Sequence, residues 1–387
     1  MTTHTELGSL AIRNVRGSAI RDLLAITERP DVISLAGGLP APELLPADRV
    51  ADATARALAA PSALQYGPTA GAPALREVVR FRESAAIGRD AGEVVVTHGS
   101  QQALALLAQV LLNPGDTVVV EDPGYAGALQ AFAAVRANIQ AVPIDDAGMR
   151  VDELRPLLER GGVRVVHTVS NFHNPGGATL SGERREQLAR LADEYGFWII
   201  EDDPYGCLRF RGAELVPVAA LTDRVIRLSS ASKIIAPALR VGWMHGDPTV
   251  LGLVERIKQA ADLCGSGLMQ AIAADILADG AWLDEHLRQI RSLYGERAQA
   301  LHAALGQTFG SRLSLTEPEG GMFLWGEFAD GTDTSAALSA AVAAGVAYVP
   351  GAAFAVTTGH AGALRLCFTT YEPRRLREAV QRLGTVF

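Results

Sequence analysis

The chain has 387 residues, a formal net charge of −8 at pH 7 and 48% hydrophobic residues. This length can bury a large core and exceeds one typical domain, so two closely associated lobes are expected. Because the charge is mildly acidic and no block of like charge occurs, the composition favours neither nucleic acid nor an anionic membrane as a partner.

The N-terminal segment lacks the basic and then apolar pattern of a signal peptide, which predicts a cytoplasmic protein. Residues 12–24 are amphipathic and predict a helix, with Arg13, Arg16 and Arg21 roughly on its polar side. The three cysteines lie far apart and lack the spacing of a zinc site, so we expect reduced thiols and no metal.

Seven β-rich runs alternate with helical patterns between about residues 70 and 280. The runs are 94–97, 117–121, 139–143, 163–169, 198–201, 225–228 and 241–245. They predict an α/β lobe with a mainly parallel, seven-stranded sheet flanked by helices. In such sheets ligands bind beyond the carboxyl ends of the strands, so the residues directly after each run are candidate functional residues.

After residue 280 the pattern changes to a long helix at 282–305, short strands at 313–316, 322–327, 347–349 and 363–368, and a last helix. This pattern is typical of a smaller α+β lobe. Residues 336–356 carry no charge over a length that could span a bilayer, but Gly345, Pro350 and Gly351 interrupt them. We therefore expect a helix, a strand and a loop there, and no membrane span.

These patterns predict three parts of the chain. Residues 1–45 would form an N-terminal lid helix and arm that packs with the small lobe. Residues 46–280 would form the large α/β domain, and residues 281–387 the small C-terminal domain.

Lys233 is one of only two lysines in an arginine-rich chain, and it lies in a polar turn after the strand at 225–228. An amine can lose its proton and condense with an aldehyde, whereas guanidinium stays charged. The residue therefore suggests covalent attachment of a carbonyl compound, although two lysines left by an arginine-rich composition would look the same. The other lysine, Lys258, lies in an amphipathic stretch and is expected to be a solvated surface charge.

Two further strand ends suggest binding groups. After residues 94–97, a glycine turn precedes Ser100, which can cap a helix whose free N–H groups bind phosphate. After residues 163–169, a turn presents Asn174, whose amide can donate to a phenolate oxygen. Each segment alone also fits a plain structural role, as a capped helix or a turn.

A third strand end places Asp202 after an apolar run, where a buried carboxylate needs a cation such as a protonated ring nitrogen. Tyr205 can return a hydroxyl to the same pocket. Asp202 or Asp203 can equally be a turn cap before a proline. Close to the lysine, Ser230 and Arg240 can both reach one phosphate.

A phosphate site, a phenolate donor, a carboxylate for a pyridinium nitrogen and a reactive lysine are together what pyridoxal 5′-phosphate requires. The chain resembles the fold-type I pyridoxal-phosphate enzymes of aminotransferase class I/II, in the branch that includes 2-aminoadipate and kynurenine aminotransferases. The motifs that carry the resemblance are ISLAGGLP at 33–40, YGPTAG at 66–71 and LRLCF at 364–368, besides the strand ends above. Their order along nearly the whole chain makes the resemblance specific.

The resemblance implies a role for each candidate. Lys233 would form the internal aldimine and move the proton at the substrate α-carbon, and Asp202 would keep the ring nitrogen protonated. The other cofactor contacts would be Asn174 and Tyr205 to the 3′ oxygen, Tyr125 stacked on the ring, Ser100, Gln101, Ser230 and Arg240 to the phosphate, and Tyr66 to the same phosphate from the second subunit of a homodimer.

The same resemblance implies the substrate contacts. Arg365 would clamp the α-carboxylate, with Asn174 beside it, while Arg21 and Ser18 of the lid helix would select the side chain and Gly38 would line the apolar part of the lid. The equal alternative for Arg21 is a merely solvated side chain. One departure concerns the turn: the family usually has Asn-Pro-Thr-Gly where this chain has Asn-Pro-Gly-Gly at 174–177, which puts the rigidity of that loop in question.

The function implied is transfer of an amino group from an L-amino acid to a 2-oxo acid, most simply 2-oxoglutarate, by a ping-pong mechanism. Similar enzymes also act as lyases or oxidases, so these reactions are the alternative. A more remote one is a pyridoxal-phosphate-binding regulatory domain. Such regulators carry a DNA-binding segment before the aminotransferase-like part, for which the lid helix beginning near residue 9 leaves no room.

Overall fold

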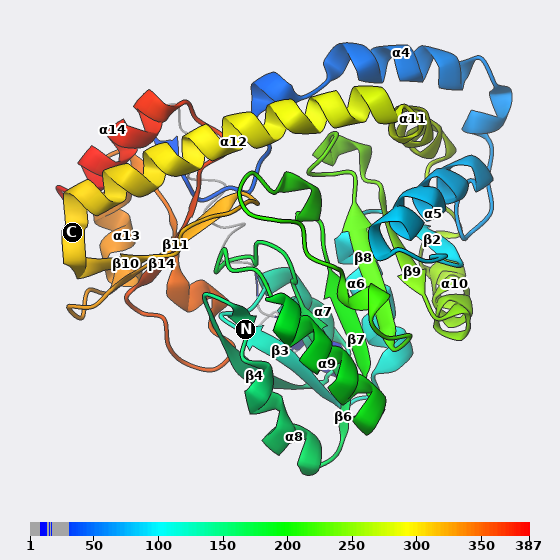
Figure 1. The fold of residues 1–387 in the computed structure, drawn as a ribbon, viewed down its shortest axis with the longest axis horizontal. Helices are drawn as coiled ribbons and strands as arrows, with labels where there is room; N and C mark the ends of the chain where they lie inside the picture. The colour runs from blue at the N-terminus through cyan, green and yellow to red at the C-terminus, as the bar shows by residue number, and fades with distance from the viewer. Residues whose placement is uncertain (1–7, 14, 16, 18–30) are drawn as a thin grey trace.

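The computed structural model describes residues 8–13, 15, 17 and 31–387 (Figure 1). Most of the predicted lid helix at 12–24, with Ser18 and Arg21, lies outside the described residues. A short helix, α2 (Leu10–Arg13), is the described part of this region.

The described chain forms a large sheet in the order β2-β9-β8-β7-β6-β3-β4-β5. Its strands are β2 (Val94–Thr97), β3 (Thr117–Asp122), β4 (Asn138–Asp145), β5 (Gly148–Met149), β6 (Val163–Thr168), β7 (Trp198–Asp202), β8 (Val225–Ser230) and β9 (Gly242–Gly246). The five strands from β8 to β4 run parallel, so the predicted mainly parallel sheet is confirmed. The predicted number of seven strands is wrong, because β5 adds an eighth at the edge; its two residues are too few to show a periodicity.

Helices cover both faces of this sheet (Figure 1). They are α5 (Pro73–Ile87), α6 (Ser100–Leu111), α7 (Ala126–Ala134), α8 (Arg155–Glu159), α9 (Gly182–Tyr195) and α10 (Pro248–Asp262). Side chains alternate between the two faces of a strand: Val118 and Val120 of β3 pack with α6, α7 and α10, whereas Val119 packs with α8 and α9. Strands buried on both faces have the apolar runs seen in the sequence.

A smaller antiparallel sheet has the order β10-β11-β14-β13. It consists of β10 (Leu313–Leu315), β11 (Phe323–Phe328), β13 (Val349–Pro350) and β14 (Ala363–Cys367), with α13 (Thr334–Ala343) and α14 (Pro373–Leu383) beside it. The predicted strand at 347–349 is split between β13 and β12 (Val346–Ala347), which pairs in parallel with β1 (Ile33–Ser34). The N-terminal arm therefore joins the C-terminal part of the chain.

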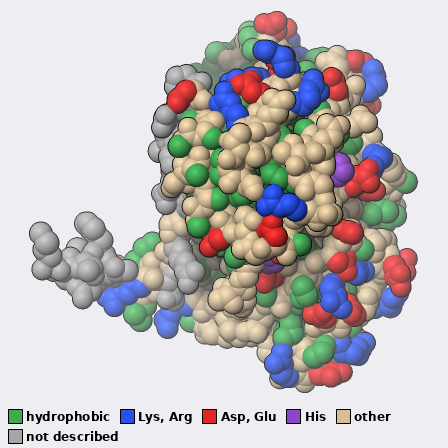
Figure 2. Space-filling view, turned by 90° about the vertical axis from the view of Figure 1, so that its left-hand side faces the viewer, with side chains coloured by type: hydrophobic (Ala, Val, Ile, Leu, Met, Phe, Trp, Pro, Cys, Tyr) green, Lys and Arg blue, Asp and Glu red, His purple; other side chains and the backbone are tan. Residues whose placement is uncertain are grey.

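One long helix links the two sheets. In Figure 1, α12 (Gly280–Phe309) runs from α11 (Gly267–Ala278), near α4 (Ala47–Leu58), to α14 at the other end of the molecule. The described residues contain no helix long and apolar enough to cross a membrane. On the face shown in Figure 2, basic and acidic side chains are interspersed.

The prediction for Lys258 is wrong. Its side chain is buried, with 0% exposure, and its Nζ lies 2.9 Å from Oδ1 of Asp262, one helical turn later. Asp262 also accepts a hydrogen bond from Gln102 of α6. Helical periodicity predicts the Lys258–Asp262 pair, but not its burial or the hydrogen bond that Gln102 of a second helix adds to the carboxylate.

Candidate active site

A cavity of about 300 Å³ lies beyond the carboxyl ends of β6, β7 and β8. The predicted site residues that line it are Gly38, Ser100, Gln101, Tyr125, Asn174, Asp202, Tyr205, Ser230, Lys233, Arg240 and Arg365. Tyr66 is not among them: its side chain is exposed, at 79%. The cavity thus joins strand ends of the large sheet with Gly38 of the N-terminal arm and Arg365 of β14, which lie more than 300 positions apart in the chain.

One end of the cavity suits an anion. Helix α6 begins at Ser100, whose Oγ is buried and has no hydrogen-bond partner among the described residues. Arg240 donates from Nη2 to the backbone oxygen of His98 at 2.7 Å, directly before the helix. Ser230 and Arg240 therefore flank the free N–H groups of a helix start, an arrangement that binds phosphate.

The predicted capping role of Ser100 is wrong, because Gly99 occupies the N-cap position. Gly99 has φ +81°, a conformation that strains any other residue, and a Cβ there would lie 2.8 Å from Nη2 of Arg240 and force this guanidinium to shift. Ser100 is left with its hydroxyl beside the cavity. Ser232, which the sequence analysis did not single out, also lines this end and contacts the Ser230 hydroxyl at 2.9 Å. The serine-rich turn before the lysine is the signal that could have identified it.

Lys233 lines the cavity. Its Nζ donates to the backbone oxygen of Gly38 at 2.8 Å. Burial, followed by the nearby positive charges of Arg365 and Arg240, lowers the pKa of Lys233 to about 8. A sizeable fraction of the amine is thus neutral near physiological pH, as attack on an aldehyde requires.

The lowered pKa makes a kinetic prediction. Capture of pyridoxal phosphate by the cofactor-free protein is expected to accelerate as pH rises through about 8, because only the deprotonated Lys233 reacts and burial shifts its loss of a proton to lower pH. Stopped-flow absorbance over a pH series measures this midpoint. A midpoint near the ordinary lysine value of 10.5 would contradict the assigned environment.

Asp202 is the acidic group of the cavity. It is 2% exposed, and its Oδ1 has no hydrogen-bond partner in the described part of the chain. Oδ2 lies 3.7 Å from Nε2 of His167, which is too long for a hydrogen bond. A buried carboxylate with an unpartnered oxygen requires a cation nearby, and a protonated ring nitrogen is such a cation. Asp203, by contrast, accepts a hydrogen bond from the Gly206 N–H at 2.7 Å, so it is Asp203 that caps the turn.

Arg365, Asn174 and Tyr205 form a connected group. Arg365 donates from Nη1 to Oδ1 of Asn174 and from Nη2 to the backbone oxygen of Ala36, both at 2.7 Å. Its Nε is buried without a hydrogen-bond partner within the described ranges, and burial lowers its pKa to about 10. The buried guanidinium thus has neutral acceptors here and can take a carboxylate.

Two tyrosines border the cavity. Nδ2 of Asn174 lies 3.4 Å from the hydroxyl of Tyr205. Burial, and then the neighbouring Tyr125, raise the pKa of Tyr205. Tyr125 lies at the start of α7, and burial raises its pKa to about 12. Its hydroxyl is 3.3 Å from Oε1 of Gln101. Both tyrosines therefore remain protonated and can donate hydrogen bonds at neutral pH.

The unusual turn at 174–177 is held by an imidazole. Nδ1 of His173 accepts the Gly176 N–H at 3.1 Å, so the ring proton is on Nε2. That nitrogen lies 3.2 Å from Oε2 of Glu121, although the contact is poorly aligned for a hydrogen bond. A Cβ on Gly176 would collide with Ile144. In this chain, which has no threonine hydroxyl in the turn, the His173 ring holds the turn through the Gly176 N–H.

Among the described residues, no group of three or more histidine, cysteine or acidic side chains is placed to hold a metal ion. The cavity instead presents three buried polar atoms that lack hydrogen-bond partners in the described structure: Ser100 Oγ, Asp202 Oδ1 and Arg365 Nε. They suit a phosphate, a protonated ring nitrogen and a carboxylate, respectively. With the amine of Lys233 in the same cavity, the residues fit pyridoxal phosphate together with an amino acid.

Comparison with known proteins gave consistent matches. The family model described as "Aminotransferase class I and II" matches residues 30–383. An aromatic-amino-acid aminotransferase of Thermococcus litoralis is 42% identical over 96% of this chain and 91% of its own length. A 2-aminoadipate transaminase of Thermus thermophilus is 37% identical over 96% and 94%. The crystal structure of Pyrococcus horikoshii kynurenine aminotransferase, in complex with PMP, superposes with a TM-score of 0.93 at 39% identity, covering 100% of this chain and 98% of that one.

Proposed function

The chain belongs to the class I and II aminotransferases, which use pyridoxal 5′-phosphate, and on that premise we propose that it transfers the amino group of an L-amino acid to 2-oxoglutarate by a ping-pong mechanism. The observation that carries the proposal is the single cavity that holds Lys233, Asp202 and Arg365. Since it contains one reactive amine and one guanidinium for an α-carboxylate, donor and acceptor have to use the same site in turn.

Each residue has a defined task in this mechanism. The bound cofactor supplies an electron sink for the substrate α-carbon. Arg365 binds the α-carboxylate and orients the substrate, and Asn174 holds Arg365 in place through Oδ1. Lys233 Nζ would take the proton from the substrate α-carbon and deliver it to C4′ of the cofactor, and its pKa of about 8 suits a base near neutral pH. The carboxylate of Asp202 keeps the ring nitrogen protonated.

The test is to follow the two half-reactions separately. Purified holoenzyme is mixed with a panel of L-amino acids in the absence of any oxo acid. We expect the yellow absorbance of the lysine-bound cofactor to disappear with release of one equivalent of the matching 2-oxo acid, and 2-oxoglutarate to restore it. Release of ammonia or peroxide instead would assign a lyase or an oxidase. If other 2-oxo acids restore the absorbance but 2-oxoglutarate does not, the proposed acceptor is wrong and the proposed reaction still holds.

We also propose a cytoplasmic homodimer in which Tyr66 of the partner subunit reaches the phosphate. Tyr66 is exposed two residues after a short 3₁₀ helix (Pro61–Leu64) whose Leu64 is also exposed, and this supports burial of both side chains by a second copy. A Tyr66→Ala variant is expected to bind the cofactor less tightly, and equilibrium dialysis measures this. The division of the chain at residues 45 and 280, and side-chain selection by Arg21, Ser18 and Gly38, remain part of the proposal.

A further inference from the structure

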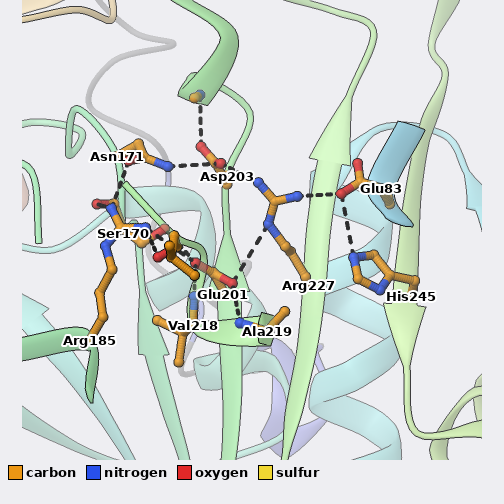
Figure 3. Close-up of polar contacts among 12 residues, drawn as sticks. Glu83, Ser170, Asn171, Arg185, Glu201, Asp203, Val218, Ala219, Arg227 and His245 are labelled. Atoms are coloured by element: carbon orange, nitrogen blue, oxygen red, sulfur yellow. Dashed lines mark hydrogen bonds and ion pairs between the residues drawn. The ribbon is translucent and has the colours of Figure 1, made fainter. Parts of the chain in front are cut away.

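A buried polar network (Figure 3) includes Glu201 and Asp203, the chain neighbours of the cavity residue Asp202. Its centre is Arg227 of β8, which contacts three carboxylates. Nη1 pairs with Glu83 of α5, Nη2 donates to Oδ2 of Asp203 at 2.6 Å, and Nε lies 3.6 Å from Oε2 of Glu201. Because Glu201 and Asp203 alternate with Asp202 along the chain, they point away from the cavity while Asp202 lines it.

The network keeps Glu83 ionised. Burial alone would raise the pKa of Glu83, but Arg227, His245 and Trp243 lower it to about 2. Burial would likewise lower the pKa of Arg227, and its carboxylate neighbours raise it well above the ordinary value. Asp203 is 3% exposed and shares the same guanidinium. Charge compensation of this kind is what permits a buried carboxylate beside an active site.

Asp203 connects two turns. Besides Arg227, its Oδ2 accepts a hydrogen bond from Nδ2 of Asn171 at 2.9 Å, and Figure 3 shows this contact. Its Oδ1 accepts the N–H of Gly206 at 2.7 Å. A Cβ on Gly206 would collide with the Asp203 carboxylate, so the glycine permits the close approach. Asn171 is in turn held by Arg185, whose Nη2 donates to Oδ1 of Asn171 at 2.7 Å.

Each turn carries a residue of the cavity. Asn171 precedes Asn174 by three positions in the turn after β6, and Gly206 directly follows Tyr205 in the turn after β7. The side chains of Asn174 and Tyr205 meet at 3.4 Å on the cavity side. The two turns are thus joined twice, once at the cavity by Asn174 and Tyr205 and once behind it by Asp203.

We propose that Asp203 is a positioning residue: its carboxylate locks the turn of Asn174 to the turn of Tyr205 and thereby fixes the pair that holds the 3′ oxygen of the cofactor. The inference rests on the proposed function of this cavity. A carboxylate is required because three donors, from Arg227, Asn171 and Gly206, converge on two oxygens. An amide has one acceptor oxygen, so at least one of these buried donors would face an NH₂ group and lose its partner.

The test compares Asp203→Asn with Glu83→Gln, which weakens the far side of the same network without touching either turn. The readouts are the dissociation constant for pyridoxal phosphate, the pH at which the absorbance of the bound cofactor changes, the KM for the amino donor, and the melting temperature of the cofactor-free protein. For Asp203→Asn we expect cofactor binding to weaken by about 10-fold, the absorbance transition to move to higher pH, and KM to rise. For Glu83→Gln we expect only a lower melting temperature.

Asn171→Ala provides a second test if Asp203→Asn does not fold. It removes the link between the turns but keeps the Arg227–Asp203 ion pair, and we expect the same direction of change in cofactor affinity and absorbance pH. Equal loss of melting temperature in Asp203→Asn and Glu83→Gln, with cofactor affinity and absorbance unchanged in both, would reduce Asp203 to a structural role and overturn the inference. Failure of the unaltered protein to bind pyridoxal phosphate would instead reject the proposed function itself.

Discussion

Replacement of Lys233 by alanine is expected to abolish the yellow absorbance of the bound cofactor and to lower kcat by at least about 10³-fold, since proton transfer by a positioned side chain alone typically contributes about 10²–10⁴-fold. The amine of Lys233 is both the group that attaches to the aldehyde and the base beside the substrate. The spectrum of the holoenzyme and single-turnover rates with an amino donor measure the two roles separately.

Lys233→Arg is the matched variant, because it keeps a positive charge but cannot condense with an aldehyde. It is expected to fail in the same way as Lys233→Ala. Lys258→Met serves as the control for loss of the only other lysine: it removes a buried partner of Asp262 and costs stability, but it leaves the cavity and its absorbance intact. An active, yellow Lys233→Ala protein would refute the assignment.

Replacement of Asp202 by asparagine is expected to lower kcat by roughly 10²–10³-fold, the range found when one pre-organised electrostatic group is removed from an active site. A neutral amide no longer favours a protonated ring nitrogen, so the cofactor becomes a weaker electron sink. The cofactor-free variant is expected to melt at or above the temperature of the unaltered protein, because a buried carboxylate with an unpartnered oxygen in the described structure is itself unfavourable.

Single-turnover kinetics and thermal melting of the cofactor-free protein check this pair of effects. Asp223→Asn makes the same chemical change at a side chain that is 89% exposed beside Arg89, and it should alter neither quantity appreciably. A marked loss of stability in Asp202→Asn without loss of turnover would show that Asp202 supports the fold and not the reaction.

The sequence predicted those site residues whose chemistry stands out at the end of a recognisable strand. Apolar runs predicted the strands of the large sheet, and the rule that ligands bind beyond parallel strand ends selected Asn174, Asp202 and Lys233, which the structure brings into one cavity. Ser230 and Arg240 followed from their spacing to the lysine. Tyr125, Gln101 and Arg365 were identified by resemblance to a family, because their chemistry alone does not distinguish them from ordinary packing residues.

Other features depend on contacts that no local pattern encodes. Lys258 was predicted to be a surface residue because its burial, and the hydrogen bond from Gln102 of a second helix to its partner Asp262, cannot be seen in the local sequence. The sequence alone did not separate the roles of Asp202 and Asp203. The structure does, because Asp202 lines the cavity whereas Asp203 pairs with Arg227. The contact between His173 and Glu121 likewise joins residues that lie far apart in the sequence.

The most direct test of the account is to treat the holoenzyme with borohydride, which fixes pyridoxal phosphate to the side chain that holds it, and to map the labelled peptide by mass spectrometry. Because the chain contains only two lysines, the assignment is unambiguous. We predict one cofactor per chain, on the peptide that contains Lys233, and loss of this label when an amino donor is added before the reduction. A label on Lys258, or no label on a protein that still transfers amino groups, would contradict the account.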